Sequence, residues 1–465
     1  MTEVEDLARF AVRARYRDLS EDARAQLKIR VLDSLGCAIG ALNAEPVRMV
    51  RDQVEAFGGN PLCTLIGGGK SAPDRAAFLN GALVRYLDFM DAYLATAETC
   101  HPSDNLAPVL AAAEFADASG KTFLAALAVA YQVQARLSDE APVRDRGFDH
   151  TVQGAYAVGA GLARALGLDD ARSAQGISLA GVGNIALRVT RTGVLSHWKG
   201  LAYPNTAFIA THAAFLASRG VTGPLEIFEG NKGLKQSVTG SFAIDWRHED
   251  LERVRRTIVK CYDAEIHAQS AIEGVLELRR THRFEAAEVE KVSVDIFDVA
   301  YRIIGGGEEG AKVDIHTKEE ADHSLPYMVA AALCDGALGP AQYAPARIAA
   351  SDVQDLLHRV EIRTDAALSS RFPEQLPCRI AIALKGGRVV EIEKQDYHGF
   401  HTRPFSWDDA KRKFCILCEP FTAQPLCNAI LECVERLESL QVRELTRFLE
   451  AVPAQVRESE DFFTA

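Results

Sequence analysis

Alanine and glycine fill a series of apolar segments in the first half of the chain, and no other feature restricts the possible fold as strongly. The apolar residues of these segments recur with the period of an α-helix, and such small side chains let neighbouring helices come close together. Residues 1 to about 245 are therefore predicted to form closely packed, buried helices. The segments are residues 76–87, 106–116, 121–137, 153–168, 171–183 and 205–220.

One further helix in this region has a recognisable beginning. Ser20 is placed to cap it. Glu21 and Asp22 bring negative charge to its first turn, where the helix dipole favours it. The helix is predicted to run to residue 42, with an apolar stripe made of Leu27, Val31, Leu35 and Ile39.

The pattern changes after about residue 250. Alternating apolar and polar residues predict strands at 289–300, 358–365 and 379–397. The pair Gly386–Gly387 predicts a hairpin turn inside the last of these segments. Helices are expected among and after the strands, at 263–280, 324–336, 407–417, 429–437 and 442–452.

Together these patterns predict a fold that is mainly α-helical with a smaller α+β domain. We expect a helical domain over residues 1–250 and an α+β domain over 251–400. C-terminal helices over 401–465 are expected to pack back on the helical domain. A chain of 465 residues is long enough for two or three domains with a large core.

Charge and composition narrow the class of protein. The net charge of −12 argues against nucleic acid and against an anionic membrane surface as partners. The N-terminus lacks the basic and apolar regions of a signal peptide, and the most apolar run, residues 123–133, is too short to cross a bilayer. The ten scattered cysteines are typical of reduced, mostly buried thiols. We therefore expect a cytoplasmic protein that does not bind membranes.

Three short motifs resemble cofactor or metal sites but lack an essential part. The segment Gly67–Ser71 ends like a phosphate-binding loop, yet Thr64 stands where that loop needs its first glycine. The segment Gly181–Gly183 fits a loose dinucleotide fingerprint, but it follows a predicted helix, so close helix packing explains it better. The pair Cys415–Cys418 lacks a second pair at zinc spacing. These motifs therefore predict neither a nucleotide cofactor nor a metal.

The stretch from residue 86 to residue 105 concentrates acidic side chains between two predicted helices. Pro102 disfavours helical backbone at His101, so this histidine is expected just before a helix start, close to carboxylates that can orient it. A polar loop whose Ser103 caps the next helix would also explain the stretch. The acidic residues are Asp88, Asp91, Glu98 and Asp104.

Histidines and cations gather in later stretches, each beside a glycine, a proline or a helix start. Each residue alone is more often structural. Together they could bind a ligand with roughly three negative charges, such as a tricarboxylate at neutral pH. An acidic protein must supply such cations locally. The residues are His150, Arg191, His197, Lys199, Lys260, Glu265, His267, His323 and Tyr327.

Five motifs, in this order, resemble the MmgE/PrpD family, and the match covers most of residues 30–400. It is closest to the 2-methylcitrate dehydratase branch. The resemblance implies a large helical domain and a smaller α/β lid domain, with the active site between them. It also implies a cytosolic homodimer that uses no cofactor, neither a metal nor an iron–sulfur cluster. The motifs are HPSDN (101–105) and the segments 147–168, 196–224, 260–273 and 322–333.

Residue by residue, the resemblance places the family's site at Asp88, His101, His150, Lys199 and Lys260. In the mechanism that we expect, His101 is oriented by Asp88 and transfers the proton, with His150 as its acid or base partner. Lys199 and Lys260 stabilise the developing charge. Further candidates for substrate binding are Asp91, Arg191, His197, His267, His323 and Tyr327.

The expected reaction is dehydration of a 2-hydroxy tricarboxylate, such as 2-methylcitrate in propionate catabolism, or citrate. The cis-aconitate decarboxylase branch of the family resembles the chain less well. In this chain Met90-Asp91-Ala92 lacks a hydroxyl that this branch has, and Glu265 stands in place of a histidine. Decarboxylation of cis-aconitate and epimerisation of iminodisuccinate remain alternatives, and a non-catalytic carboxylate-binding protein is a remote one.

Overall fold

The computed structural model describes residues 1–307 and 312–455 and divides the chain into two compact units. The first unit contains Met1–Arg188, Gly200–Thr257 and the chain from Phe405 onward. The second unit contains Val189–Lys199 and Ile258–Pro404. Helices predominate, and the smaller second unit combines helices with a sheet, so the predicted fold class is confirmed.

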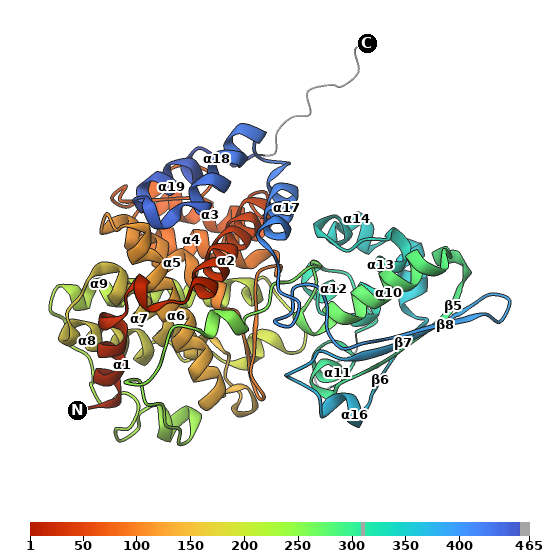
Figure 1. Ribbon diagram of the computed structural model, residues 1–465, viewed down its shortest axis with the longest axis horizontal. Coiled ribbons are helices and arrows are strands. Elements are labelled where there is room, and N and C mark those ends of the chain that lie inside the picture. The colour runs from red at the N-terminus through yellow and green to blue at the C-terminus, as the bar shows by residue number, and fades with distance from the viewer. Residues whose placement is uncertain (308–311, 456–465) are drawn as a thin grey trace, which may run out of the picture. The chain divides into compact units, whose positions relative to one another are not determined.

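The first unit consists mainly of helices (Figure 1). Two short antiparallel ribbons interrupt them, β1 (Cys63–Thr64) with β2 (Lys70–Ser71) and β3 (Tyr93–Leu94) with β4 (Thr99–Cys100). The helices are α1 (Glu3–Arg13), α2 (Glu21–Gly40), α3 (Glu45–Phe57), α4 (Pro73–Tyr86), α5 (Leu106–Phe115), α6 (Gly120–Glu140), α7 (Thr151–Leu166), α8 (Asp170–Val182), most of α9 (Trp198–Ser218), α17 (Trp407–Cys418), α18 (Gln424–Glu435) and α19 (Val442–Glu450).

Small residues allow the close helix packing of this unit. α7 contacts α5, α6 and α8, and its residues are almost all buried. A methyl group added at Gly161 would lie 2.9 Å from Val109 of α5 and 3.0 Å from Ala130 of α6. Such contacts leave no room for larger side chains at the helix crossings. The alanine and glycine of the sequence therefore serve helix packing, as predicted.

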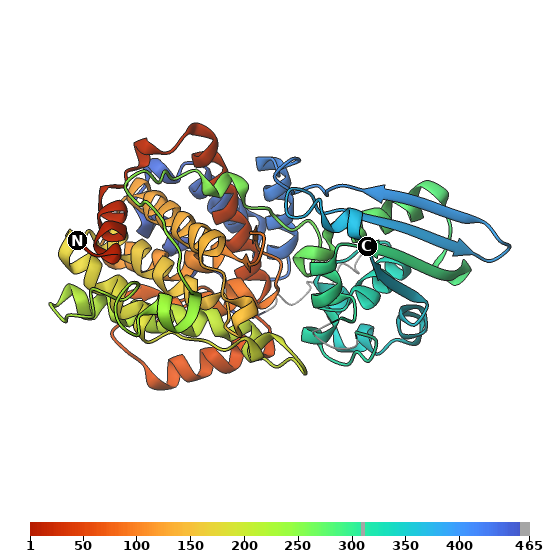
Figure 2. The same ribbon diagram turned by 90° about the horizontal axis from the view of Figure 1, so that it is seen from below.

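The C-terminal helices α17 and α18 pack on α2 in the first unit (Figures 1 and 2). The predicted beginning of α2 is confirmed, since the Ser20 hydroxyl accepts a hydrogen bond from the Ala23 N–H. Lys413 of α17 forms a buried ion pair with Asp33 of α2 at 2.7 Å. Its ammonium group also donates to the Phe89 carbonyl at 2.6 Å. α17 is thus tied both to α2 and to the segment that follows α4.

The second unit contains a four-stranded sheet in the order β6-β5-β7-β8. β5 pairs in parallel with β6 and antiparallel with β7, and β7 pairs antiparallel with β8. α10 and α13 pack on each other and on the sheet, covering one of its faces (Figure 1). The strands are β5 (Val289–Ile296), β6 (Val360–Thr364), β7 (Cys378–Leu384) and β8 (Val389–Lys394). The helices are α10 (Gln269–His282), α11 (Asp298–Ile304), α12 (Lys318–Ala321), α13 (Leu325–Asp335), α14 (Pro345–Ile348), α15 (Ser351–Leu357) and α16 (Ala366–Ser369).

Most predicted elements of the second unit are confirmed, with shifted ends. The hairpin turn between β7 and β8 contains Gly386 and Gly387 at φ of 88° and 82°, which glycine adopts readily. The strand predicted over 289–300 ends earlier, because Asp298 begins α11. α9 begins at Trp198 and not near residue 205, because Pro204 is accommodated inside the helix.

No helix among the described residues has the length and apolar character needed to cross a membrane.

A substitution at Gly181 can test whether helix packing explains the glycine motif Gly181–Gly183. Gly181 lies in α8, and an added methyl group there would come within 2.1 Å of the Tyr156 ring. We expect Gly181→Ala to lower the free energy of unfolding by about 1–3 kcal/mol, because overpacking forces neighbours to shift. Gly183→Ala is the matched control, since no atom lies within 4 Å of its added methyl group. Urea denaturation of both variants is the measurement, and equal stabilities would contradict the packing explanation.

Candidate functional site

Residues 87–105 form a short hairpin and a turn between α4 and α5. β3 pairs with β4, with Tyr93 opposite Cys100. After β4, one 3₁₀ turn (Pro102–Asn105) leads directly into α5. His101 is the residue before this turn, with a non-helical backbone (φ −125°, ψ 89°), as predicted from the following proline. The local sequence thus places a buried imidazole at a helix start.

The tautomer of His101 follows from its hydrogen bond. Its Nδ1 lies 2.9 Å from the carbonyl oxygen of Asp91. A carbonyl oxygen only accepts, so a neutral His101 carries its proton on Nδ1 and a lone pair on Nε2. Such an imidazole is ready to accept a proton at Nε2. The Asp91 carbonyl orients the ring through Nδ1, and orientation of His101 by the Asp88 carboxylate stays a prediction.

Asp91 holds the turn in place. Its side chain is fully buried, and its Oδ1 accepts a hydrogen bond from the Ser103 N–H at 2.9 Å. Burial raises the pKa of this carboxyl, partly offset by the bonds from Ser103 and the charge of Arg30. Backbone and side chain of Asp91 thus support both His101 and the turn after it. These contacts give Asp91 a positioning task, and its binding of substrate stays a prediction.

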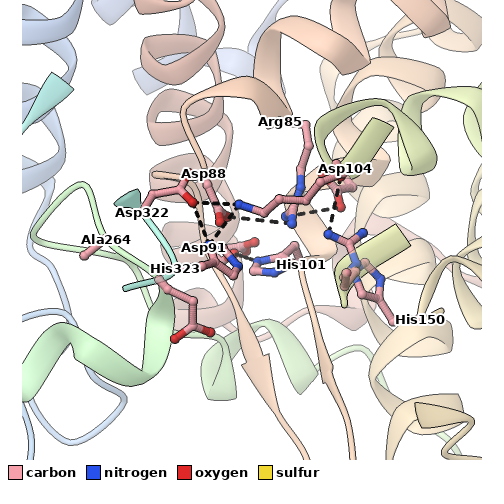
Figure 3. Close-up of polar contacts among 12 residues, drawn as sticks. Arg85, Asp88, Asp91, His101, Asp104, His150, Ala264, Asp322 and His323 are labelled. Atoms are coloured by element: carbon pink, nitrogen blue, oxygen red, sulfur yellow. Dashed lines mark hydrogen bonds and ion pairs between the residues drawn. The ribbon is translucent and has the colours of Figure 1, made fainter. Parts of the chain in front are cut away.

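A buried arginine organises the carboxylates of this region. Arg85, near the end of α4, lies between Asp88 and Asp104, at 3.7 and 3.8 Å (Figure 3). All three side chains are buried. Asp88 has a φ of 56°, a left-handed conformation that aspartate tolerates better than most residues and that often marks functional sites. The chain thus leaves α4 with a sharp turn that holds Asp88 near Arg85.

His150 lies beside His101 in the first unit. Their ring centroids are 5.6 Å apart, in an edge-to-face arrangement. His150 is buried at the start of α7, and its Nε2 lies 3.8 Å from the Asp149 carboxylate. Asp149 also accepts a hydrogen bond from the Thr151 N–H at 3.1 Å, so its carboxylate is fixed by the helix start. Two predicted catalytic histidines are therefore neighbours.

A buried polar network supports this pair of histidines. The Tyr203 hydroxyl donates to the Asn105 side chain at 2.9 Å, and Asn105 donates to Gln134 at 2.6 Å. The Tyr203 ring lies 6.2 Å from the His150 ring. A methyl group added at Gly154 would come within 2.4 Å of Tyr203, so this glycine makes space for the tyrosine. The network fixes the turn that follows His101.

The second unit holds a cluster of charged side chains around Asp322. Lys199 Nζ lies 2.9 Å from Oδ1 of Asp322 and 2.9 Å from Nδ1 of His323. Lys318 Nζ contacts the other carboxylate oxygen at 2.6 Å. Burial alone would raise the pKa of Asp322, but Lys199 and Lys318 hold it well below its usual range. Asp322 is therefore ionised and positions the ammonium group of Lys199.

Glu265 organises the predicted residues of the segment 260–267. Its two oxygens accept hydrogen bonds from His267, at 2.7 Å from Nδ1 and 2.8 Å from the backbone N–H. Burial alone would raise the pKa of this carboxyl, but the nearby His267, His323 and Lys260 lower it to about 2. Lys260 is fully buried. The structure thus brings Lys260, His267 and His323 together around one ionised glutamate.

This low pKa predicts an acid sensitivity of the second unit. The Glu265 carboxyl titrates near 4.5 when unperturbed and near 2 when folded, so it stabilises the folded state above pH 4.5. This stabilisation is lost as the pH falls towards 2. Between pH 6 and 3 we expect the wild type to lose about 2 kcal/mol more unfolding free energy than Glu265→Gln. Urea titrations at both pH values measure this, and equal losses would contradict it.

Two predicted binding residues lie apart from these contacts. His197 is exposed, although Lys199, two residues later, is buried. Tyr327 donates its hydroxyl to the backbone carbonyl of Gln342, which gives it a structural task within the second unit. Arg191, in contrast, is buried and donates to the Lys199 carbonyl at 3.3 Å. It therefore adds a cation next to Lys199.

The charges around Glu265 and Asp322 suit an anion. Four cationic side chains near these two carboxylates exceed them in number by two, even with neutral histidines. An acidic protein gains such a local excess only by bringing distant segments together. The cations are Arg191, Lys199, Lys260 and Lys318, and the carboxylates are Glu265 and Asp322.

Sequence reasoning missed three residues of these clusters. Arg85 stands three residues before Asp88, a helical spacing at which opposite charges meet, and this signal could have identified it. Asp322 directly precedes the predicted His323, and Lys318 lies one helical turn before Asp322. Each of these spacings between charged residues is also common in surface helices. The burial of the clusters distinguishes them from surface pairs, and the sequence does not reveal it.

Comparison with known proteins agrees with these features. The model of the MmgE/PrpD N-terminal domain matches residues 5–247, and the model of the MmgE/PrpD C-terminal domain matches residues 262–439. The chain is 27% identical to cis-aconitate decarboxylase of Mus musculus, covering 92% of this chain and 89% of the relative. It is 29% identical to 2-methylcitrate dehydratase of Cupriavidus necator, covering 89% and 90%. The corresponding enzyme of Escherichia coli is 28% identical, covering 78% and 79%.

Proposed function

Because the chain belongs to the MmgE/PrpD family, we propose that it is a hydro-lyase that converts a 2-hydroxy tricarboxylate to an aconitate-type alkene. 2-Methylcitrate is the first candidate substrate and citrate the second. The proposal rests chiefly on the hydrogen bond from His101 to the Asp91 carbonyl, which leaves Nε2 as the proton-accepting atom. The names of several relatives, 2-methylcitrate dehydratase, support the choice of reaction.

In the proposed reaction, His101 removes the proton from the carbon beside a carboxylate. Such a proton is a weak acid, and its removal places negative charge on the carboxylate. Nδ1 of His101 is held by the Asp91 carbonyl, which keeps the base in one orientation. Arg85 and Asp88 support the same segment from the end of α4. This arrangement limits the reorganisation needed in the proton transfer.

Lys199 and Lys260, assisted by Arg191, bind the carboxylates of the substrate and stabilise the developing charge. The cationic side chains gathered around Glu265 and Asp322 support this role. Asp322 positions Lys199 through an ion pair of 2.9 Å. His150 is proposed to protonate the leaving hydroxyl, because its ring lies beside that of the proposed base.

Other reactions of the family also begin at the carbon beside a carboxylate. A decarboxylase acting on cis-aconitate is the second candidate, because the mouse relative with that name matches 92% of the chain. The segment Met90-Asp91-Ala92 and Glu265, which depart from the pattern of that branch, favour dehydration over decarboxylation. We further propose that the protein is a cytoplasmic homodimer. A role in propionate catabolism fits 2-methylcitrate as its substrate.

A panel of three substrates tests the reaction. The protein is incubated separately with 2-methylcitrate, citrate and cis-aconitate, and the products are identified by mass spectrometry and by absorbance of a conjugated alkene. We expect 2-methylcitrate to lose one water molecule and give the alkene. Release of CO2 from cis-aconitate without dehydration would identify a decarboxylase. Unchanged compounds in all three incubations would leave an epimerase or a binding protein and overturn the proposal.

A further inference from the structure

Three thiols come together where α17 meets α18 in the first unit. Cys415 and Cys418 lie one turn apart on α17, and Cys427 lies in the first turn of α18. The sulfur atoms of Cys415 and Cys427 are 3.7 Å apart. The sequence does not reveal this contact, because Cys427 follows Cys418 by nine residues and belongs to the next helix. None of the proposed catalytic steps uses these thiols.

Cys427 has the surroundings of a reactive thiol. It lies close to the N-terminus of α18, where the helix dipole favours a thiolate. Hydrogen bonding from Cys418, then from Cys415, and the charge of Lys411 outweigh the effect of burial and lower the pKa of Cys427 to about 7. Burial, followed by the hydrogen bond with Cys427, raises the pKa of Cys415 to about 11. One member of the pair is therefore the better nucleophile.

The exposure of Cys415 and the short distance between the two sulfur atoms also favour a reaction between Cys427 and Cys415. Cys427 is 4% exposed, and its neighbour Cys415 is partly exposed, so the pair reaches the surface through Cys415. A disulfide requires the sulfur atoms to approach from 3.7 Å to about 2.05 Å, a movement of under about 2 Å. α17 and α18 already pack on each other and on α2, so a cross-link joins helices that are neighbours.

We propose that Cys427 is a site of oxidation by peroxide and that Cys415 is the resolving thiol that closes a disulfide between α18 and α17. The Cys427 thiolate attacks one oxygen of hydrogen peroxide, so that an S–O bond forms, the O–O bond breaks and hydroxide leaves. The Cys415 thiol then attacks the sulfenic sulfur, an S–S bond forms, and the S–O bond breaks. The released protons convert both oxygens to water, so two thiols are oxidised and one peroxide is reduced.

Peptide mapping of the full-length protein tests this inference. The reduced protein is treated with one equivalent of hydrogen peroxide, blocked with an alkylating agent, digested without reductant and analysed by mass spectrometry. We expect a peptide pair linked through Cys415 and Cys427 that disappears after treatment with dithiothreitol. The Cys427→Ser variant should lack the linked pair. The double variant Cys415→Ser/Cys418→Ser should instead trap a sulfenic acid on Cys427 that reacts with dimedone.

Cys433 is the matched control, because it lies on the same helix, is equally buried at 4%, and has a pKa raised by burial to about 11. We expect iodoacetamide to modify Cys427 of the wild type at least about tenfold faster than Cys433 at neutral pH. The wild-type protein alone supports both measurements, so the result does not depend on the folding of a variant. Equal rates for the two thiols, together with no linked peptide after peroxide, would overturn the proposal.

Discussion

His101→Gln lowers kcat/KM for tricarboxylate dehydration by about 10²- to 10⁴-fold, the range expected when a general base is removed. The glutamine amide can still donate to the Asp91 carbonyl, so the hairpin keeps the contact that His101 makes at 2.9 Å. What the variant lacks is the basic Nε2. Steady-state kinetics with the substrate that the panel identifies will measure the change.

A control for this variant is His248→Gln, since His248 is an exposed histidine of the same unit, paired with Asp245 at 2.8 Å. It should retain wild-type kinetics. Circular dichroism and thermal unfolding of both variants separate loss of the base from loss of the fold. Undiminished dehydration by a folded His101→Gln variant would remove His101 from the mechanism.

Lys199→Met raises KM and lowers kcat together, with a loss of about 10²- to 10³-fold in kcat/KM. The reason is that the ammonium group binds a carboxylate in the ground state and stabilises additional charge in the transition state. Asp322 keeps its ion pair with Lys318 at 2.6 Å in this variant, so the buried carboxylate retains one partner. Kinetics over a range of substrate concentrations separate the two parameters.

Lys318→Met is the matched control, because it removes the other ammonium partner of Asp322 and leaves Lys199 in place. If Lys199 acts on the substrate, Lys318→Met should lose less than about tenfold in kcat/KM. Equal losses in the two variants would show that both lysines serve only to neutralise Asp322. That outcome would contradict a direct role of Lys199.

Elements determined by local sequence could be predicted well. The cap at Ser20 and the glycine turn at 386–387 depend on residues that are neighbours in the chain, and both are confirmed. The position of His101 before a helix start followed from one proline. The helix predicted over 205–220 begins earlier, because α9 starts at Trp198 and contains Pro204.

Contacts between distant residues could be predicted only in part. The sequence suggested Lys199 and His323 as site residues, but not that they lie 2.9 Å apart with Asp322 beside them. The proposed task of Asp88 shows the same limit. Its carboxylate lies 3.7 Å from Arg85, and a backbone carbonyl, which carries no sequence signal, holds Nδ1 of His101. Hydrogen bonds to backbone atoms depend on the fold and cannot be read from residue types.

The fate of a labelled proton tests the central claim most directly. The substrate is 2-methylcitrate that carries deuterium on the carbon bearing its methyl group. It is incubated with the wild type and with His101→Gln, and the masses of the products are measured by mass spectrometry. We predict that the wild type releases both water and the label and yields an unlabelled alkene, while the variant leaves the substrate intact and labelled. Retention of the label by the wild type, or its release by the folded variant at the wild-type rate, would contradict proton removal by His101.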